Sequence, residues 1–176
     1  MIVIFGPAGA GKSTQGEILA KKLGRVNLSA GQIIRDSGKF NNATAVGAMI
    51  SEEDLVNLIR EAVEEAEKKG LDVVFDGQPG EPSQVELWEK VGLLAKIEQI
   101  LVLKLTREES LTRLEKRGRD DDKKQVWERK LDYFEQKICS FLQQFSDRGV
   151  KIEEIDGKGE IEEVSERIAK ACGVSF

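Results

Sequence analysis

The chain of 176 residues is long enough for one domain with a substantial core and short for two. Hydrophobic residues make up 40% and charged residues 34%, a balance that excludes a disordered or membrane-spanning chain and indicates a soluble globular one. The formal net charge of −5 argues against a nucleic-acid scaffold, and the first residues do not resemble a secretion signal. We therefore expect a cytoplasmic protein with no nucleic-acid or membrane partner. We also expect a monomer.

The cysteines and the lack of histidine restrict the chemistry that the chain can perform. Cys139 and Cys172 lie far apart in apolar helical patterns, so we expect both to be small core residues in a reducing compartment. With no C-x-x-C pair and no histidine, a structural zinc site is not expected and general-base catalysis by histidine is excluded. Any reaction must use lysine, arginine, carboxylates and a metal ion.

The chain begins with the pattern of a strand, a glycine-rich turn and a helix. Residues 1–5 (MIVIF) form a short apolar run, typical of a strand buried on both faces of a parallel sheet. Residues 6–14 (GPAGAGKST) match G-x-x-x-x-G-K-[ST], and a helical pattern follows from Ser13. The glycines allow backbone N–H groups to converge on an anion, to which the helix start adds its own free N–H groups. This segment predicts a nucleoside triphosphate site in which Lys12 contacts the β- and γ-phosphates and Ser13 binds Mg²⁺.

Strands and helices alternate along the rest of the chain. The remaining strand candidates are residues 25–28, 72–75, 99–105 and 150–155. Helical patterns fill the intervals, with capping boxes at residues 51–54 and 106–109 and helix stops at Gly70 and Gly149. This order predicts an α/β fold with a five-stranded parallel sheet and right-handed crossovers.

Residues 121–145 have the pattern of one long amphipathic helix. Its large apolar residues recur at helical spacing: Trp127, Leu131, Phe134, Ile138, Phe141, Leu142 and Phe145. We interpret this stripe as core and not as a cofactor site. Two other stretches, residues 37–47 and 118–124, are polar or highly charged and are candidates for segments that cover a ligand.

Charged residues follow several of the expected strands. Asp76 ends the third strand, at the sheet edge that carries the glycine-rich loop, and either supplies a carboxylate on the Mg²⁺ side or only starts the next turn. Arg35 follows the second strand and is a candidate for binding the phosphate of a second substrate. Arg113 and Arg117 share a helix face and Arg119 lies nearby, so we expect all three to meet phosphate oxygens, as phosphoryl transfer requires.

Five segments in this order resemble adenylate kinase and its nucleoside monophosphate kinase relatives over residues 1–172. They are GPAGAGKST, LSAGQIIR, FDGQP, RLEKRGRDDD and IDGKGEIEEV. The resemblance implies reversible, Mg²⁺-dependent transfer of the γ-phosphoryl group from ATP to a nucleoside monophosphate on a single P-loop NTPase domain. That domain would consist of a core (1–28, 59–117 and 125–176), a monophosphate-binding flap (29–58) and a short lid (118–124).

The resemblance also implies roles for individual residues. Lys12 stabilises the transferring phosphoryl group, Arg113 stacks on the ATP base, and residues 156–159 lie beside that base. Arg35 binds the monophosphate and Gln84 reads the adenine of AMP. The implied set is Lys12, Arg35, Arg117, Arg119 and Lys130 for catalysis; Gly9, Ala10, Gly11, Lys12, Ser13, Thr14, Arg113, Arg117 and Gly159 for ATP; Ser29, Arg35, Ile50, Gly77, Gln84 and Arg119 for the monophosphate; and Ser13 and Asp76 for Mg²⁺, partly through water.

The chain departs from the family pattern on the acceptor side. Gly80 replaces an arginine that clamps the monophosphate, and Lys130 aligns with a second arginine, which loses bidentate geometry. Ala30 and Gln32 stand where the family has a hydroxyl and a carboxylate. Each lost charged contact costs roughly 1.5–3 kcal/mol, or about ten- to hundredfold in affinity.

The acceptor is therefore open at this stage. Gln84 favours AMP, whereas Ala30 and Gly80 weaken that choice, so UMP, CMP or a deoxynucleotide remains an alternative. A second alternative is an ATP-binding regulatory protein whose transfer activity is weakened by Gly80. A third is a small-metabolite kinase of the same architecture, against which Gln84 and the charged segment 118–124 argue.

Overall fold

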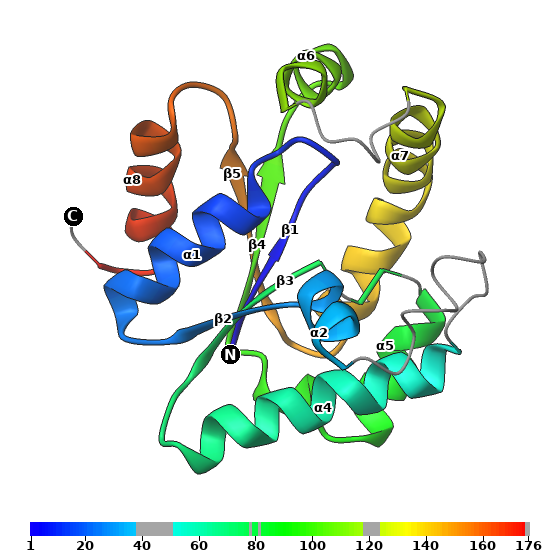
Figure 1. Ribbon diagram of the computed structural model, residues 1–176, viewed down its shortest axis with the longest axis vertical. Helices are drawn as coiled ribbons and strands as arrows, with labels where there is room; N and C mark the ends of the chain where they lie inside the picture. The colour runs from blue at the N-terminus through cyan, green and yellow to red at the C-terminus, as the bar shows by residue number, and fades with distance from the viewer. Residues whose placement is uncertain (38–50, 78, 81, 118–123, 175–176) are drawn as a thin grey trace.

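The computed structural model describes residues 1–37, 51–77, 79–80, 82–117 and 124–174 (Figure 1). A five-stranded parallel sheet with strand order β2-β3-β1-β4-β5 forms its centre. The strands are β1 (Ile2–Phe5), β2 (Val26–Ser29), β3 (Val73–Asp76), β4 (Gln99–Lys104) and β5 (Lys151–Asp156). The predicted α/β fold is confirmed, and each expected strand lies within one residue of its predicted bounds.

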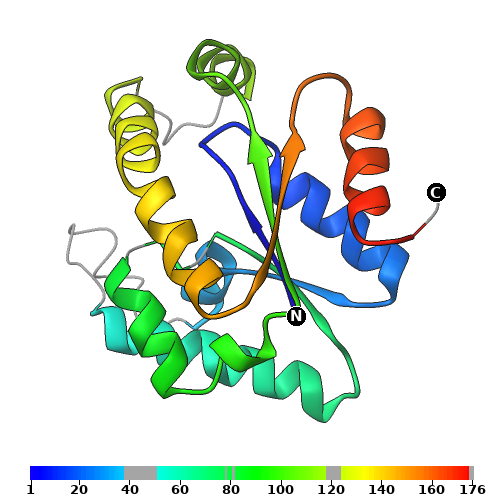
Figure 2. The same ribbon diagram turned by 180° about the vertical axis from the view of Figure 1, so that it is seen from behind.

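Helices cover both faces of the sheet. They are α1 (Lys12–Leu23), α2 (Ala30–Asp36), α4 (Glu52–Lys68), α5 (Pro82–Lys90), α6 (Arg107–Arg117), α7 (Lys124–Asp147) and α8 (Ile161–Ala171), with a short 3₁₀ turn, η1 (Leu94–Lys96). Helices α1 and α8 lie on one face, and α4, α5 and α7 lie on the other, as the view from behind also shows (Figure 2). None of the described helices has the length and apolar character needed to cross a membrane.

The predicted helix ends are present. Ser51 Oγ accepts a hydrogen bond from the Asp54 N–H at 3.1 Å, and Thr106 and Glu109 cap α6 reciprocally through their side chains and N–H groups. Gly70 and Gly149 follow α4 and α7 with positive φ, as expected of helix stops.

Strand β1 contributes to two separate cores because its side chains alternate between the faces of the sheet. Val3 and Phe5 pack with the side chains of α4, α5 and α7. Ile2 and Ile4 pack with those of α1 and α8. A central strand covered on both faces must therefore be apolar throughout, which is why the sequence signal was clear.

Helix α7 confirms only part of the interpretation as core. Trp127, Leu131, Phe141 and Phe145 are buried, and the Phe5 and Phe141 rings meet edge to face with centroids 4.9 Å apart. Phe134, Ile138 and Leu142 are only half-buried. The long stripe is therefore core along one side and lines a cavity along the other, as described below.

The expectation that both cysteines are core residues is wrong for Cys139. Its side chain is exposed, whereas Cys172 is half-buried. Cys139 follows Ile138 by one residue, which turns it about 100° around the helix and away from the apolar stripe. Burial raises the pKa of the Cys172 thiol.

Charged groups form a cluster at the amino ends of strands β1, β2 and β4. Glu98 accepts two hydrogen bonds from Arg25, at 3.1 and 2.9 Å, and pairs with the amino group of Met1. Burial raises the pKa of Glu98, but the hydrogen bonds from Arg25 and the amino group outweigh it and hold the pKa below its ordinary value.

The expected flap and lid are described only in part. The flap, residues 29–58, is represented by α2 and the first turns of α4, because residues 38–50 lie outside the described residues. Of the expected lid only Lys124 is described, and it begins α7. The proposed division of the domain stays a prediction.

Candidate active site

The glycine-rich loop joins β1 to α1 at the carboxyl edge of the sheet. Gly9 has a φ of +83°, and a Cβ there would lie 2.7 Å from the Ser110 carbonyl oxygen of α6, so only glycine fits this position. Lys12 begins α1, and its Nζ donates to the carbonyl oxygens of Gly6 and Pro7, each at 2.9 Å. The lysine therefore lies back across the loop that precedes it.

Lys12 lies between two cavities and lines both of them. The larger, of about 500 Å³, lies over α1 and the start of α8, and we call it the donor cavity after the ATP site predicted there. The smaller, of about 210 Å³, lies between the loop and α7, and we call it the acceptor cavity after the second substrate predicted on this side. The Lys12 ammonium group therefore lies where a ligand in one cavity would approach a ligand in the other.

The donor cavity brings together most of the residues predicted for ATP. Gly9, Ala10, Gly11, Lys12, Ser13, Thr14, Arg113 and Gly159 all line it. These residues come from the loop, from α6 and from the segment after β5, which are far apart in sequence. A nucleotide bound here would have its phosphates at the start of α1, where free N–H groups favour anions.

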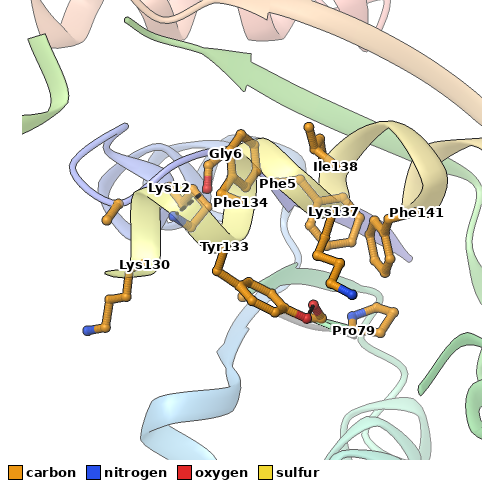
Figure 3. A pocket seen from close by; sticks show the side chains of 13 residues that line it. Phe5, Gly6, Lys12, Pro79, Lys130, Tyr133, Phe134, Lys137, Ile138 and Phe141 are labelled. Carbon is orange, nitrogen blue, oxygen red and sulfur yellow. Dashed lines mark hydrogen bonds between the residues drawn. The ribbon is translucent and has the colours of Figure 1, made fainter. Parts of the chain in front are cut away.

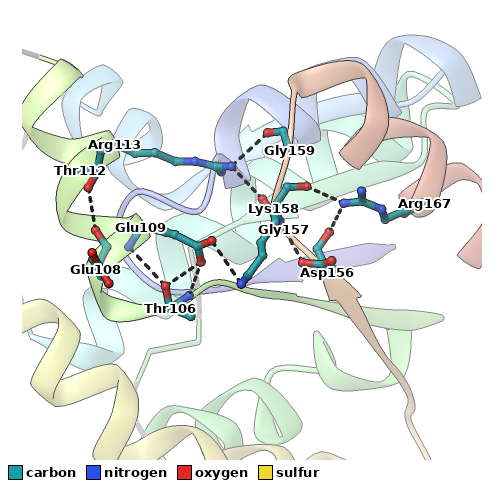
Figure 4. Close-up of polar contacts among 10 residues, drawn as sticks. All are labelled: Thr106, Glu108, Glu109, Thr112, Arg113, Asp156, Gly157, Lys158, Gly159 and Arg167. Carbon is teal, nitrogen blue, oxygen red and sulfur yellow. Dashed lines mark hydrogen bonds and ion pairs between the residues drawn. The ribbon is translucent and has the colours of Figure 1, made fainter.

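An arginine of α6 and an isoleucine of α8 line the donor cavity away from the glycine-rich loop. The Arg113 Nη2 donates to the carbonyl oxygens of Gly157 and Gly159, at 3.0 and 3.1 Å (Figure 4). Ile161, at the start of α8, lines the same cavity and is 50% exposed. A guanidinium plane and an apolar side chain suit a planar base between them.

Sequence reasoning missed four residues of this cavity: Gln15, Glu160, Ile161 and Val164. Gln15 is 4% exposed; its Nε2 donates to the Ile161 carbonyl oxygen at 2.9 Å, and its Oε1 accepts from Ser165 Oγ at 2.6 Å. It therefore ties α1 to α8. A glutamine on the inward face of a helix indicates a buried hydrogen-bonded side chain. The sequence does not show which residues it binds.

Ser13 and Asp76 form the predicted metal position. Ser13 Oγ donates to Asp76 Oδ2 at 2.5 Å, and Asp76 is 4% exposed at the end of β3, opposite Ile4 of β1. A hydroxyl and a carboxylate are ligands that Mg²⁺ accepts, so these residues fit the ion. Within the described residues no three acidic, cysteine or histidine side chains cluster, so phosphate oxygens and water would have to complete the coordination.

The acceptor cavity has aromatic walls and a cationic lining (Figure 3). Phe5, Tyr133, Phe134 and Phe141 are among the residues that form the walls. Lys12, Lys130 and Lys137 also line it, and none of the described lining residues is acidic. The cavity is therefore suited to an anion on the side of Lys12 opposite the donor phosphates.

Gly80 lies in the wall of the acceptor cavity and is held from both sides. Its N–H donates to Gln84 Oε1 at 2.8 Å, and its carbonyl oxygen accepts from the Tyr133 hydroxyl at 2.9 Å. Gly77 and Pro79 line the same wall. The segment that lacks the expected arginine is thus fixed by its backbone between α5 and α7.

The other predicted acceptor residues lie near this edge without lining either cavity. Ser29 pairs with Asp76 in the sheet register. Arg35 donates to Gln32 Oε1 at 2.6 Å, and its Nη1 would lie 3.5 Å from a Cβ on Gly31, so it folds back along α2. Gln84 is 5% exposed, behind Gly80.

Three predicted residues cannot be placed in the site. Ile50, Arg119 and the side chain of Arg117 lie outside the described residues. Lys130 lines the acceptor cavity, and the neighbouring Arg129 does not. Of these two adjacent cations on α7, Lys130 is therefore the candidate for the acceptor side, and its role there stays a prediction.

A parallel sheet with a glycine-rich loop, a lysine between two cavities and a Ser–Asp pair defines a P-loop phosphotransferase. A family model described as an AAA domain matches residues 5–128, more than half of the chain. The chain is 31% identical to adenylate kinase of Micrococcus luteus, over 97% of this chain and 89% of that protein. It is 31% identical to adenylate kinase of Maricaulis maris (97% of both chains) and 32% identical to that of Caulobacter vibrioides (97% and 95%).

The chain belongs to the adenylate kinase family. It is a phosphotransferase, a nucleoside monophosphate kinase that uses ATP.

Proposed function

We propose that the protein transfers the γ-phosphoryl group of Mg²⁺-bound ATP to AMP and forms two molecules of ADP. The observation that carries the proposal is the position of Lys12, which lines a donor and an acceptor cavity at once. The adenylate kinases that the chain resembles over almost its full length favour AMP as the acceptor.

The reaction is a single in-line displacement. An oxygen of the acceptor phosphate attacks the γ-phosphorus, the bond from that phosphorus to the β–γ bridging oxygen breaks, and the bridging oxygen leaves on ADP. No residue needs to form a covalent intermediate, which suits a chain without histidine. The protein contributes positions and positive charge.

The donor side supplies most of that contribution. The loop N–H groups and the start of α1 hold the phosphates, and Lys12 meets the charge that develops on the transferring group. Ser13 and Asp76 would hold Mg²⁺, which neutralises the β- and γ-phosphates when bound. Arg113 and the loop after β5 position the base.

The acceptor side has Lys130 where the family has an arginine, which could bind a phosphate through two parallel hydrogen bonds. We infer that Lys12, Lys130 and Arg35 bind the acceptor phosphate, and that Gln84 contacts the adenine and also fixes Gly80. A lysine offers a point charge where an arginine would offer two parallel donors, so acceptor binding should be the weak step of the reaction. Arg117 and Arg119 are proposed to add phosphate contacts, and Ile50 to contact the acceptor. Cytoplasmic location and a monomeric state are also part of the proposal.

A coupled assay with ATP, Mg²⁺ and each monophosphate tests the proposal. We expect AMP to be the best acceptor among AMP, UMP, CMP, GMP and deoxynucleotides. Lys12→Ala should lower kcat by roughly 100- to 1000-fold, because a group aimed at the developing charge is lost. Lys21→Ala, at the exposed far end of the same helix, is the matched control and should leave kcat unchanged.

Two outcomes would replace this function. Faster turnover of another monophosphate would assign a different acceptor. Tight ATP binding with no acceptor turned over at millimolar concentration would favour an ATP-binding regulatory protein, for which the lack of an arginine among the described residues of the acceptor cavity is the motivating observation.

A further inference from the structure

The loop between β5 and α8, residues 156–159, has an alternating pattern of carbonyl contacts. Arg113 of α6 binds the carbonyl oxygens of Gly157 and Gly159. Arg167 of α8 binds those of Asp156 and Lys158, through Nη1 at 2.8 and 2.6 Å (Figure 4). Four successive carbonyl groups are therefore held by two guanidinium groups that come from opposite sides.

The N–H groups of the same loop are also engaged. Gly157 N–H donates to the Lys104 carbonyl oxygen at 2.8 Å, and Lys158 N–H donates to Asp156 Oδ1 at 3.0 Å. A Cβ on Gly157 would lie 2.8 Å from the Lys104 carbonyl oxygen, so this close approach requires glycine. The backbone of the loop has little freedom to choose another conformation.

An ion pair links the loop to α6 as well. Lys158 Nζ lies 3.3 Å from Glu109 Oε1. The hydroxyl and the N–H of Thr106 hydrogen-bond Glu109 and hold its pKa below the ordinary value, so it stays anionic and available to Lys158. The loop is thus fixed to α6 and α8, two of the helices that border the donor cavity.

The two arginines differ in what they can touch. Arg113 lines the donor cavity, together with Gly159 of the loop, whereas Arg167 does not line it. Arg167 is half-buried on α8 and reaches the loop from the side opposite Arg113 (Figure 4). Its guanidinium group therefore acts on the loop through the carbonyl groups that it holds and does not line the cavity itself.

We propose that Arg167 is a positioning residue that presets the loop 156–159 for the base of the nucleotide donor. Holding the loop in one conformation before binding removes the ordering cost that a free loop would add. The triphosphate binds at the other end of the cavity, at the start of α1, so Arg167 should affect recognition of the base and not of the phosphates. The inference rests on the proposed function only for the identity of the donor.

Binding of two ligands by the purified, nucleotide-free protein tests the inference. ATP uses both ends of the donor cavity, whereas inorganic tripolyphosphate uses only the phosphate end. In Arg167→Met we expect ATP to bind about tenfold more weakly, as for the loss of a pair of charged hydrogen bonds, and tripolyphosphate to bind within about twofold of wild type. With saturating ATP, kcat should stay within about twofold, so that the change falls on the KM for ATP.

Two further variants make the test specific. Arg167→Lys should give a smaller loss than Arg167→Met, because a lysine can reach a carbonyl group but lacks the planar fork. Arg148→Met removes an arginine that binds Glu89 and the Gln144 carbonyl oxygen, far from the donor cavity, and should change neither ligand. If Arg167→Met does not fold, Arg167→Lys carries the comparison.

Equal weakening of ATP and tripolyphosphate would overturn the inference, because it would show a general structural defect. Unchanged ATP binding in Arg167→Met would overturn it as well. Failure of the proposed function has a different signature: wild-type protein would bind ATP but would not phosphorylate AMP, and the ratio of ATP to tripolyphosphate affinity would still report on Arg167.

Discussion

Gly80→Arg would place a guanidinium group in the wall of the acceptor cavity. The cavity has a volume of about 210 Å³ and three lysines in its lining, so there is both space and an existing preference for anions. The side chains of Gln84 and Tyr133 bind the N–H and carbonyl groups of Gly80, so both bonds use its backbone atoms and not its side-chain position. The substitution therefore adds a donor without removing a contact that the structure shows.

The expected gain can be estimated from the contact itself. A charged hydrogen bond contributes roughly 1.5–3 kcal/mol, which corresponds to about ten- to hundredfold in affinity. Repulsion from the three lysines reduces the gain, so we expect the KM for AMP to fall by about tenfold. The KM for ATP should change by less than about twofold, because Gly80 lines the acceptor cavity and not the donor cavity.

Initial rates at varied AMP and saturating ATP measure this effect, with Gly80→Met as the control that adds bulk without charge. Gly80→Met should leave the KM for AMP unchanged or raise it. The reasoning is refuted if Gly80→Arg and Gly80→Met shift the KM for AMP in the same direction and by similar amounts. An equal fall in the KM for ATP would also contradict it.

Three other properties follow from the described contacts. Asp76→Asn removes the anionic acceptor of the Ser13 hydroxyl, and we expect about a hundredfold fall in kcat/KM and a higher Mg²⁺ requirement in a Mg²⁺ titration of activity. A thiol reagent should modify Cys139 quickly and Cys172 slowly, since only Cys139 is exposed, and Cys139→Ser should remove the fast phase. Glu98→Gln should lower the free energy of unfolding at pH 7 by about 1 kcal/mol, measured in urea. Because the folded pKa of Glu98 is lowered, this difference is present above its ordinary value of 4.5 and is lost as pH falls through the folded pKa.

Each of these expectations has an outcome that contradicts it. Normal activity of Asp76→Asn at low Mg²⁺ would exclude the Ser13–Asp76 pair as the metal position. Equal modification rates of Cys139 and Cys172 would contradict the packing of α7 and α8. A stability difference between wild type and Glu98→Gln that persists unchanged at pH 2 would show that the charge of Glu98 is not its cause.

The strands could be predicted from the sequence because they are buried on both faces. Residues 2–5 and 73–75 are apolar throughout, and glycine or a charged residue marks their ends. The donor side was equally visible, since six of its residues are contiguous in Gly9–Thr14. The strands and the loop could be predicted because the residues that form each of them are neighbours in the sequence.

Contacts between distant segments could not be predicted in the same way. The sequence shows that Gly80 is unusual, but not that Tyr133 binds its carbonyl oxygen, because that bond depends on how α7 packs on the sheet. Arg167 has no sequence signal beyond a charged helix position. The error at Cys139 has a simpler cause: one residue changes the helix face, and an apolar neighbour does not imply burial.

Transfer of label from γ-labelled ATP tests the central claim most directly. If Lys12 joins a donor and an acceptor cavity, incubation with AMP and Mg²⁺ should move the label into the β-phosphate of newly formed ADP, with none on the protein, and Lys12→Ala should slow the transfer by roughly 100- to 1000-fold. Label that appears as inorganic phosphate, or that remains in ATP while ATP is bound, would contradict the account.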